Sequence, residues 1–209
     1  FPFAMAAWKL APVLAAGDCT VFKPSSTTSL SVLEFAKLVK DVIPAGVFQV
    51  VTGAGSKSGQ YLLDHPDIRK LAFTGSTEVG YSVAEAAAKK LIPATLELGG
   101  KSPVIVDETA KLRLAARRLV FGKGTNVGQT CVAPDYVFIH RRVKKEFLRL
   151  MTEEIARQYG DCLQNPFWGM IVNEKHFDRV AGLINPEKVV YGGRSDPESR
   201  KIELTLMDN

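Results

Sequence analysis

Short runs of β-branched and aromatic residues alternate with helical patterns, and this alternation constrains the fold more than any other feature of the sequence. The runs occupy residues 20–22, 47–51 and 71–73, and apolar residues recur at helical spacing over 29–42, 58–65 and 78–90. Strands separated by helices of this length form βαβ units around a mostly parallel sheet. The sequence therefore predicts an α/β fold, with a Rossmann-like parallel sheet and flanking helices.

The pattern changes at Leu98-Gly99-Gly100, where we place the boundary between two units, 1–99 and 100–209. The second unit is expected to hold strands at 103–106 and 136–139, helices at 110–121 and 143–159, a glycine-rich stretch at 122–128 and a loop-rich tail from Gly160. Gly17 is a candidate C-cap for a first helix, and residues 25–28 are candidate N-caps for the second. Both units are expected to be incomplete, because the chain starts inside an apolar helix, without Met, and the tail ends without closure.

Composition narrows the classes of function. The net charge of +5 is scattered along the chain, which argues against a nucleic-acid footprint. Three cysteines lie outside any C-x-x-C motif, so a disulfide framework or zinc site is not expected, and a reducing, cytoplasmic location fits best. No stretch of about 20 apolar residues predicts a membrane span.

Two glycine turns each follow an expected strand and open a helix. One is the 52–59 segment, Thr-Gly-Ala-Gly-Ser-Lys-Ser-Gly, and the other is 73–80, Phe-Thr-Gly-Ser-Thr-Glu-Val-Gly. Glycines at such positions let backbone amides approach a dinucleotide phosphate. The alternative is an ordinary tight turn or a capped helix, and neither turn by itself decides between them.

Two further segments carry chemistry. Glu97 stands between Leu96 and Leu98, where partial desolvation would raise its pKa and make it a usable base, although an ordinary Glu before a turn is the alternative. Cys131 follows the small-residue loop 126–130, whose amides could activate a thiolate and bind an oxyanion, although a buried structural cysteine is the commoner case. Cys19 and Cys162 are expected to be structural.

Taken together and in this order, these segments resemble the aldehyde dehydrogenase superfamily over essentially the whole chain. The residues that carry the resemblance are Phe1-Pro2-Phe3, Phe22-Lys23-Pro24-Ser25, the 52–59 turn, the 73–80 turn, 97–103 and 128–131. The Cys-Val-Ala-Pro-Asp-Tyr run at 131–136 is most similar to the class 3, fatty-aldehyde branch. The resemblance implies that 1–99 is part of an NAD(P)-binding domain and 100–209 part of a catalytic domain.

The resemblance also implies a reaction, the NAD(P)-dependent oxidation of an aldehyde to a carboxylate. Cys131 would attack the aldehyde and pass through a thiohemiacetal and a thioester, its backbone amide would stabilise the oxyanion, and Glu97 would activate the hydrolytic water. The cofactor-binding positions implied are Lys23, Ser26, Gly55, Ser56, Gly59, Gly75, Ser76, Val79, Gly80 and Leu98. Phe1, Met5 and Trp8 match aldehyde-channel positions, with core packing as the alternative, and Lys9 matches a proton relay. No metal is implied.

Three departures from the family pattern have consequences. The family places a Glu that grips the ribose 2′-hydroxyl where this chain has Ser26, so NADP is expected to be accepted as well as NAD. The oxyanion-hole Asn that precedes the family's Phe-Pro is absent, and the family's later Glu-Glu-Ile-Phe-Gly-Pro segment would lie beyond residue 209. About half of a full chain is therefore expected, and the segment alone is expected to be inactive or unstable.

Two other functions remain open from the sequence. The chain could be a non-catalytic nucleotide-binding or interaction fragment, or an acylating aldehyde dehydrogenase that transfers the thioester to coenzyme A. Glu97 argues against the acylating type, which generally lacks that base. The expected partners are an aldehyde substrate and, for the parent enzyme, further copies in a homodimer or homotetramer.

Overall fold

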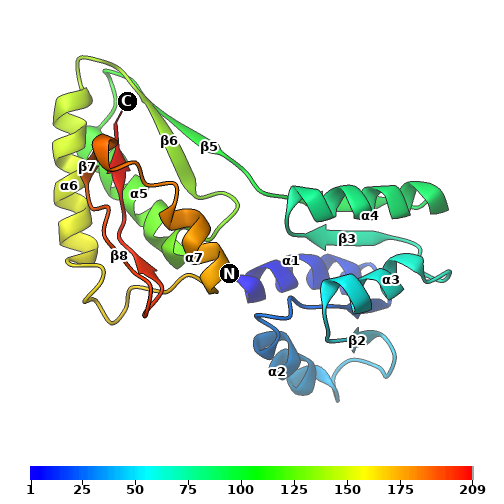
Figure 1. Ribbon diagram of the computed structural model, residues 1–209. Helices are drawn as coiled ribbons and strands as arrows, with labels where there is room; N and C mark the ends of the chain where they lie inside the picture. Colours follow the sequence, from blue (N-terminus) through cyan, green and yellow to red (C-terminus); the bar gives the residue numbers. More distant parts are fainter. Residues whose placement is uncertain (209) are drawn as a thin grey trace. The chain divides into compact units, whose positions relative to one another are not determined.

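The computed structural model describes residues 1–208 and divides into two compact units, Phe1–Gly99 and a second that begins at Gly100 (Figure 1). In both units, parallel strand pairs lie beside helices that pack on them. The predicted α/β fold is confirmed.

The first unit alternates helices and strands in chain order. Its elements are α1 (Pro2–Ala15), β1 (Thr20–Phe22), α2 (Leu30–Val39), β2 (Phe48–Val50), the π-helical turn η1 (Gly55–Gly59), α3 (Gln60–Asp64), β3 (Leu71–Thr74), α4 (Thr77–Lys90) and β4 (Ala94–Glu97). β1 pairs with β2 and β3 pairs with β4, both in parallel. Because parallel strands run the same way, the segments that follow each pair leave the sheet at one edge.

Two small apolar clusters hold this unit together. Ala6 and Leu10 of α1 pack with Val32 of α2 against β1 and β2. Val83 and Ala87 of α4 pack with Leu71 against β3 and β4. Each cluster fastens a helix to one strand pair, so the two glycine turns start from packed strands.

The second unit has a larger core and an antiparallel part. Its elements are β5 (Ser102–Val106), α5 (Leu112–Gly124), the 3-10 turn η2 (Thr125–Gly128), β6 (Pro134–Ile139), α6 (Lys144–Tyr159), α7 (Glu174–Ala181), the 3-10 turn η3 (Pro186–Lys188), β7 (Val189–Tyr191), β8 (Ser195–Asp196), β9 (Lys201–Ile202) and β10 (Leu206–Met207). β5 and β6 are parallel, whereas β7 with β10 and β8 with β9 are antiparallel. Val120 and Ile155, both fully buried, mark the contact between α5 and α6.

The structure corrects three local expectations. Residues 25–28 do not cap the second helix: α2 begins after Ser29, which makes no side-chain cap bond, and the Ser25 and Thr27 hydroxyls bond to each other. The glycine-rich stretch starts inside α5, where Gly124 leaves the space that the Tyr159 ring occupies. The tail from Gly160 is not merely loop, because it forms α7 and two strand pairs.

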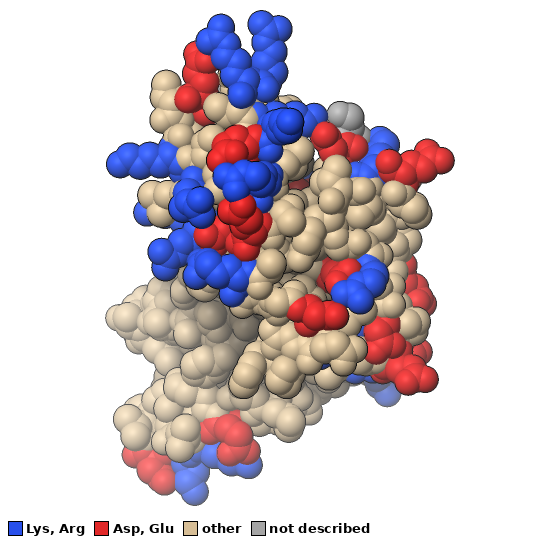
Figure 2. Space-filling view, turned by 90° about the vertical axis from the view of Figure 1, so that its left-hand side faces the viewer, with Lys and Arg blue, Asp and Glu red and all other residues tan. Residues whose placement is uncertain are grey.

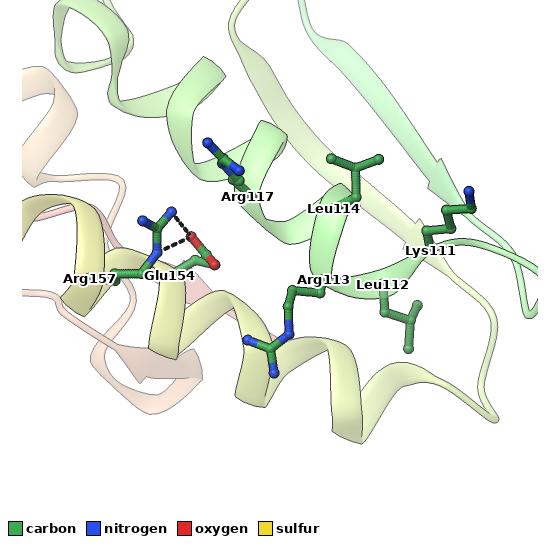
Figure 3. Close-up of a pocket in the computed structure, with 7 residues that line it drawn as sticks. All are labelled: Lys111, Leu112, Arg113, Leu114, Arg117, Glu154 and Arg157. Carbon is green, nitrogen blue, oxygen red and sulfur yellow. Dashed lines mark hydrogen bonds and ion pairs between the residues drawn. The ribbon is translucent and has the colours of Figure 1, made fainter.

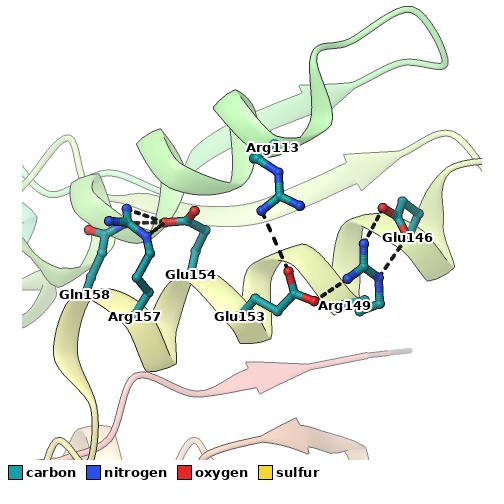
Figure 4. A network of polar contacts seen from close by, with 7 residues as sticks. All are labelled: Arg113, Glu146, Arg149, Glu153, Glu154, Arg157 and Gln158. Carbon is teal, nitrogen blue, oxygen red and sulfur yellow. Dashed lines mark hydrogen bonds and ion pairs between the residues drawn. The ribbon is translucent and has the colours of Figure 1, made fainter.

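A polar network crosses from α6 to α5 (Figure 4). Arg157 donates two hydrogen bonds to Glu154, at 3.0 and 2.6 Å, and Gln158 donates a third at 3.2 Å. The Glu154 side chain is only 6 % exposed. These hydrogen bonds, from Arg157 above all, hold the pKa of Glu154 below its ordinary value of 4.5 against the opposing effect of burial. Glu146 pairs with Arg149 about two turns earlier, but its side chain is half exposed.

Glu154→Gln is expected to lower the free energy of unfolding at pH 7 by about 1 kcal/mol, because a nearly buried acceptor loses its charge-assisted bonds. Since the pKa is lowered in the folded state, the carboxylate contributes this stability above pH 4.5 and loses it as the pH falls through the folded value. Urea unfolding of the variant and the wild type at pH 7 and pH 3.5 measures both effects. The matched control Glu146→Gln should change little at either pH, and equal effects of the two variants would contradict the assignment.

Candidate active site

Glu97 lies at the end of β4, beside the second glycine turn. It pairs in register with Thr74, and the Gly75 amide donates to the Glu97 carbonyl at 3.1 Å. The carboxylate is 3.7 Å from the Lys9 ammonium of α1. The expected desolvation is absent: alternate strand residues face opposite sides, so Leu96 packs inward while the Glu97 side chain is 56 % exposed in this unit.

The second glycine turn caps helix α4 and forms an exposed corner at Gly75 and Ser76, between β3 and α4. Ser76 is the N-cap of α4 and accepts a hydrogen bond from the Val79 amide at 3.3 Å. A methyl on Gly75 would stand 2.5 Å from the Phe73 ring, and one on Gly80 would stand 2.7 Å from Leu98. The absence of side chains at both positions therefore makes room for the Phe73 ring and for Leu98, which pack against the turn.

The first glycine turn borders Lys23. The Lys23 ammonium donates to the carbonyls of Pro24, at 2.8 Å, and Gly53, at 3.5 Å. A methyl on Gly59 would be 3.7 Å from the Lys23 stem, whereas one on Gly55 would meet no heavy atom within 4 Å. The backbone at Gly55 is thus accessible, and the Lys23 ammonium lies beside the same turn. Accessible backbone next to a cation fits an anionic dinucleotide. Ser56 lies in the same turn, within η1.

The three residues predicted to line an aldehyde channel, at the start of α1 and along it, are not part of the core. Trp8 is 67 % exposed, Phe1 is exposed and Met5 is half-buried, whereas the core side of α1 consists of Ala6 and Leu10. A cavity of about 520 Å³ opens beside Phe1, where the hydroxyl-rich segment 26–31 forms the other wall and includes the exposed Ser26. Of the residues predicted for the cofactor and the aldehyde in this unit, Ser26, Gly55, Ser56, Gly75, Ser76, Phe1 and Trp8 are exposed, whereas Gly80 is buried.

Cys131 lies just after a strained turn in the second unit and is half-buried. Asn126 and Val127 have φ values of 51° and 50°, in the left-handed region, and Gly128 follows with 78°. The Cys131 carbonyl approaches Gly100 so closely that a methyl there would be 2.9 Å from the oxygen. Gly100 and Gln129 carry no predicted role, although Gly100 follows Glu97-Leu98-Gly99 directly and Gln129 lies two residues before Cys131, which is the signal that could have singled them out.

Of the two cysteines expected to be structural, Cys162 fits: it is buried in the larger core, and burial raises the pKa of its thiol. Cys19 does not, because it is exposed and lies just before β1, where no core surrounds it. Residues 1–208 contain no group of three or more His, Cys, Asp or Glu side chains that could hold a metal ion. Within the same range, none of the helices has the length and apolarity needed to cross a membrane.

A separate cavity of about 500 Å³ opens between α5 and α6 and contains none of the predicted site residues (Figure 3). Its lining is mainly basic and includes the Glu154–Arg157 pair; the residues are Lys111, Leu112, Arg113, Leu114, Arg117, Glu154 and Arg157. Figure 2 shows basic side chains interleaved with acidic ones on the side that carries α6. The cavity is therefore a solvated groove beside ion pairs, and it is distinct from the predicted site.

Comparison with known proteins gives a consistent result. The family model described as "Aldehyde dehydrogenase family" matches residues 1–209. The chain is 41 % identical to 4,4'-diaponeurosporen-aldehyde dehydrogenase of Staphylococcus aureus, over 100 % of this chain and 46 % of the relative. It is 38 % identical to the dimeric NADP-preferring aldehyde dehydrogenase of Rattus norvegicus, over 99 % and 46 %. The chain thus spans about half the length of the curated relatives it matches.

A solved structure agrees with the sequence matches. The NAD⁺ complex of an aldehyde dehydrogenase from Bacillus cereus superposes with a TM-score of 0.88 at 35 % identity, over 98 % of this chain and 44 % of that one. At this identity and score, the similarity includes both the fold and the sequence.

Gly100→Ala is expected to destabilise the second unit by about 1–3 kcal/mol, because the added methyl meets the backbone oxygen of Cys131, which cannot rotate away. Thermal unfolding followed by circular dichroism measures the change. Gly99→Ala is the matched control, since a methyl there meets no heavy atom within 4 Å. If both variants unfold at the same temperature, the close approach at Gly100 does not hold.

Proposed function

Since this chain belongs to the aldehyde dehydrogenase family, we propose that the whole protein oxidises an aldehyde to a carboxylate with NAD or NADP. One observation supports this most directly: the family's Glu, glycine corner and Cys segments each stand at a turn with an accessible or strained backbone. Glu97 and the Gly75-Ser76 corner leave β4 and β3 at one edge, where ligands of open parallel sheets bind.

Cys131 is the nucleophile in this proposal. Its thiolate attacks the aldehyde carbon and forms a carbon–sulfur bond, and the carbonyl oxygen becomes the oxyanion of a thiohemiacetal that the Cys131 backbone amide stabilises. Loss of hydride from that carbon leaves a thioester on Cys131. Bound NAD(P)⁺ would supply the chemistry of hydride acceptance. Because NAD-bound and NADP-preferring relatives both occur, either cofactor is compatible with the family.

Glu97 is the general base for hydrolysis. It takes a proton from a water, the resulting hydroxide attacks the thioester carbon, and the carbon–sulfur bond breaks to release the carboxylate and regenerate the thiolate of Cys131. Lys9, whose ammonium is 3.7 Å from the Glu97 carboxylate, is the proposed proton relay: it releases one of its own protons to solvent and then takes the proton from Glu97. Phe1, Met5 and Trp8 are proposed to line the approach of an aliphatic or aromatic aldehyde, as in the class 3 branch.

The cofactor is held, in this proposal, by the positions on the two glycine turns. Lys23 and Ser26 contact the adenosine ribose, Gly55, Ser56 and Gly59 lie along the adenine side, and Gly75 with Ser76 binds the pyrophosphate. Val79, Gly80 and Leu98 complete the surface, since the Gly80–Leu98 approach lets helix α4 pack closely beneath it. We further propose a cytoplasmic location and a homodimeric or homotetrameric parent enzyme.

Mutation of Cys131 tests the reaction. When the whole protein is mixed with an aldehyde and NADP⁺, absorbance at the reduced-cofactor band is expected to rise, and Cys131→Ala is expected to abolish the rise, because no thiohemiacetal can form. Cys19→Ala, a change at an exposed thiol outside the proposed site, should retain it. Thermal stabilisation by the cofactor without any absorbance change would instead support a non-catalytic nucleotide-binding fragment, and reduction that depends on coenzyme A would support the acylating type.

Ser26→Glu tests cofactor choice independently of turnover. A carboxylate at position 26 would repel a 2′-phosphate and accept a bond from a free 2′-hydroxyl, so NADP⁺ affinity is expected to fall about tenfold or more relative to NAD⁺. Titration calorimetry with both dinucleotides measures the ratio. Ser31→Glu, on the same cavity wall, is the control and should leave the ratio unchanged. An unaltered ratio in Ser26→Glu would remove Ser26 from the ribose site.

A further inference from the structure

The turn that leads to Cys131 is held in a conformation that its residues do not favour. Asn126 has φ 51° and ψ 31°, and Val127 has φ 50° and ψ 37°. Asn enters the left-handed region at modest cost, but a β-branched residue such as Val does so only when its surroundings enforce it. Some contact outside the turn must therefore offset this strain.

Gln129 supplies such a contact through its side chain. Nε2 donates to the carbonyl of Met170 at 3.2 Å and to that of Asn126 at 3.3 Å, and Oε1 accepts from the Val172 amide at 3.0 Å. Asn126 returns a bond, since its Nδ2 donates to the Gln129 carbonyl at 2.9 Å. One amide thus closes the turn on itself and fastens it to a segment 41 residues further along the chain.

The segment that receives Gln129 is firmly anchored. Ile171 is 4 % exposed and packs with Phe177 and Ile202. Its amide donates to the Arg200 carbonyl at 2.9 Å, and the Arg200 Nε donates back to the Ile171 carbonyl at 3.2 Å. Val127 packs against the same cluster. The bonds from Gln129 therefore connect the turn to packed core and not to a loose loop.

Two short backbone bonds carry the position of residue 129 on to Cys131. The Thr130 amide donates to the Gly128 carbonyl at 2.9 Å, and the Ala133 amide donates to the Thr130 carbonyl at 3.0 Å. The first bond encloses residue 129 and the second encloses Cys131, and the two share Thr130. We therefore expect a shift of residue 129 to displace the sulfur.

We propose that Gln129 is a positioning residue that fixes the Cys131 thiol by tying the left-handed turn to residues 170–172. The proposal rests on Cys131 being the nucleophile of the proposed function. Gln129 itself touches no reacting atom; it acts through the turn.

The test compares Gln129→Ala and Gln129→Glu with the wild type by hydrogen–deuterium exchange and by alkylation of Cys131 with iodoacetamide across a pH series. Cys19, exposed in the other unit, is the internal reference. In Gln129→Ala, hydrogen exchange over 126–132 should be about tenfold faster. The Cys131-to-Cys19 alkylation ratio should rise about tenfold, because the turn that holds the half-buried Cys131 thiol loosens. The pH profile of Cys131 alkylation should also shift. Gln129→Glu keeps the acceptor for Val172 but, when ionised, lacks both donors, so it should behave like Gln129→Ala.

The control is Gln164→Ala. Gln164 is an exposed glutamine of the same unit, and among the described residues its hydrogen bond is made by the backbone amide, which donates to the Asp161 carbonyl at 3.2 Å. The control variant should leave exchange over 126–132 and the alkylation ratio unchanged. If Gln129→Ala unfolds the unit, Gln129→Glu decides, because it keeps the size of the side chain and the acceptor for the Val172 amide. Faster exchange with an unchanged Cys131 ratio and pH profile would reduce Gln129 to a structural residue and overturn the proposal, as would no change at all. Failure of the proposed function would appear separately, as cofactor reduction that survives Cys131→Ala.

Discussion

Parallel pairing of β3 with β4 is the constraint on which the first unit's chemistry depends. The register places Glu97 opposite Thr74, and the Gly75 amide extends the ladder by one bond to the Glu97 carbonyl. The proposed base and the proposed phosphate-binding corner are thereby held next to each other by backbone hydrogen bonds. β1 and β2 repeat the arrangement for Lys23 and the first glycine turn, with the Val51 amide bonded to the Phe22 carbonyl.

The sequence predicted the elements that carry this arrangement because their signals are local. The strand at Thr20–Phe22 and the long helix ending at Tyr159 lie where periodicity placed them. Features that depend on distant partners were missed. Gly124 lies within α5, with the Tyr159 ring in the space beside it, and the tail folds because β7 pairs with β10 on either side of the β8–β9 pair.

The candidate site shows the same division. A motif indicates which residues carry the chemistry, but exposure and strain depend on packing. The flanking leucines suggested a desolvated Glu97, yet the alternation of strand side chains turns it outward toward Lys9. The family resemblance predicted Cys131 as the nucleophile but not that Val127 is left-handed, because the turn packs against and bonds to residues far along the chain.

A nucleophile that must form and break a bond in each cycle needs a fixed position more than a buried one. If Cys131 is that nucleophile, as we propose, the second unit fixes it through three features: a valine in an unfavourable conformation, a glycine that admits the Cys131 carbonyl, and one glutamine side-chain amide whose nitrogen and oxygen both form hydrogen bonds. Each of these acts within residues 100–208, so the local placement of the thiol is a property of this unit's own core. The same core, centred on Val120 and Ile155, supports α5, from which the turn emerges.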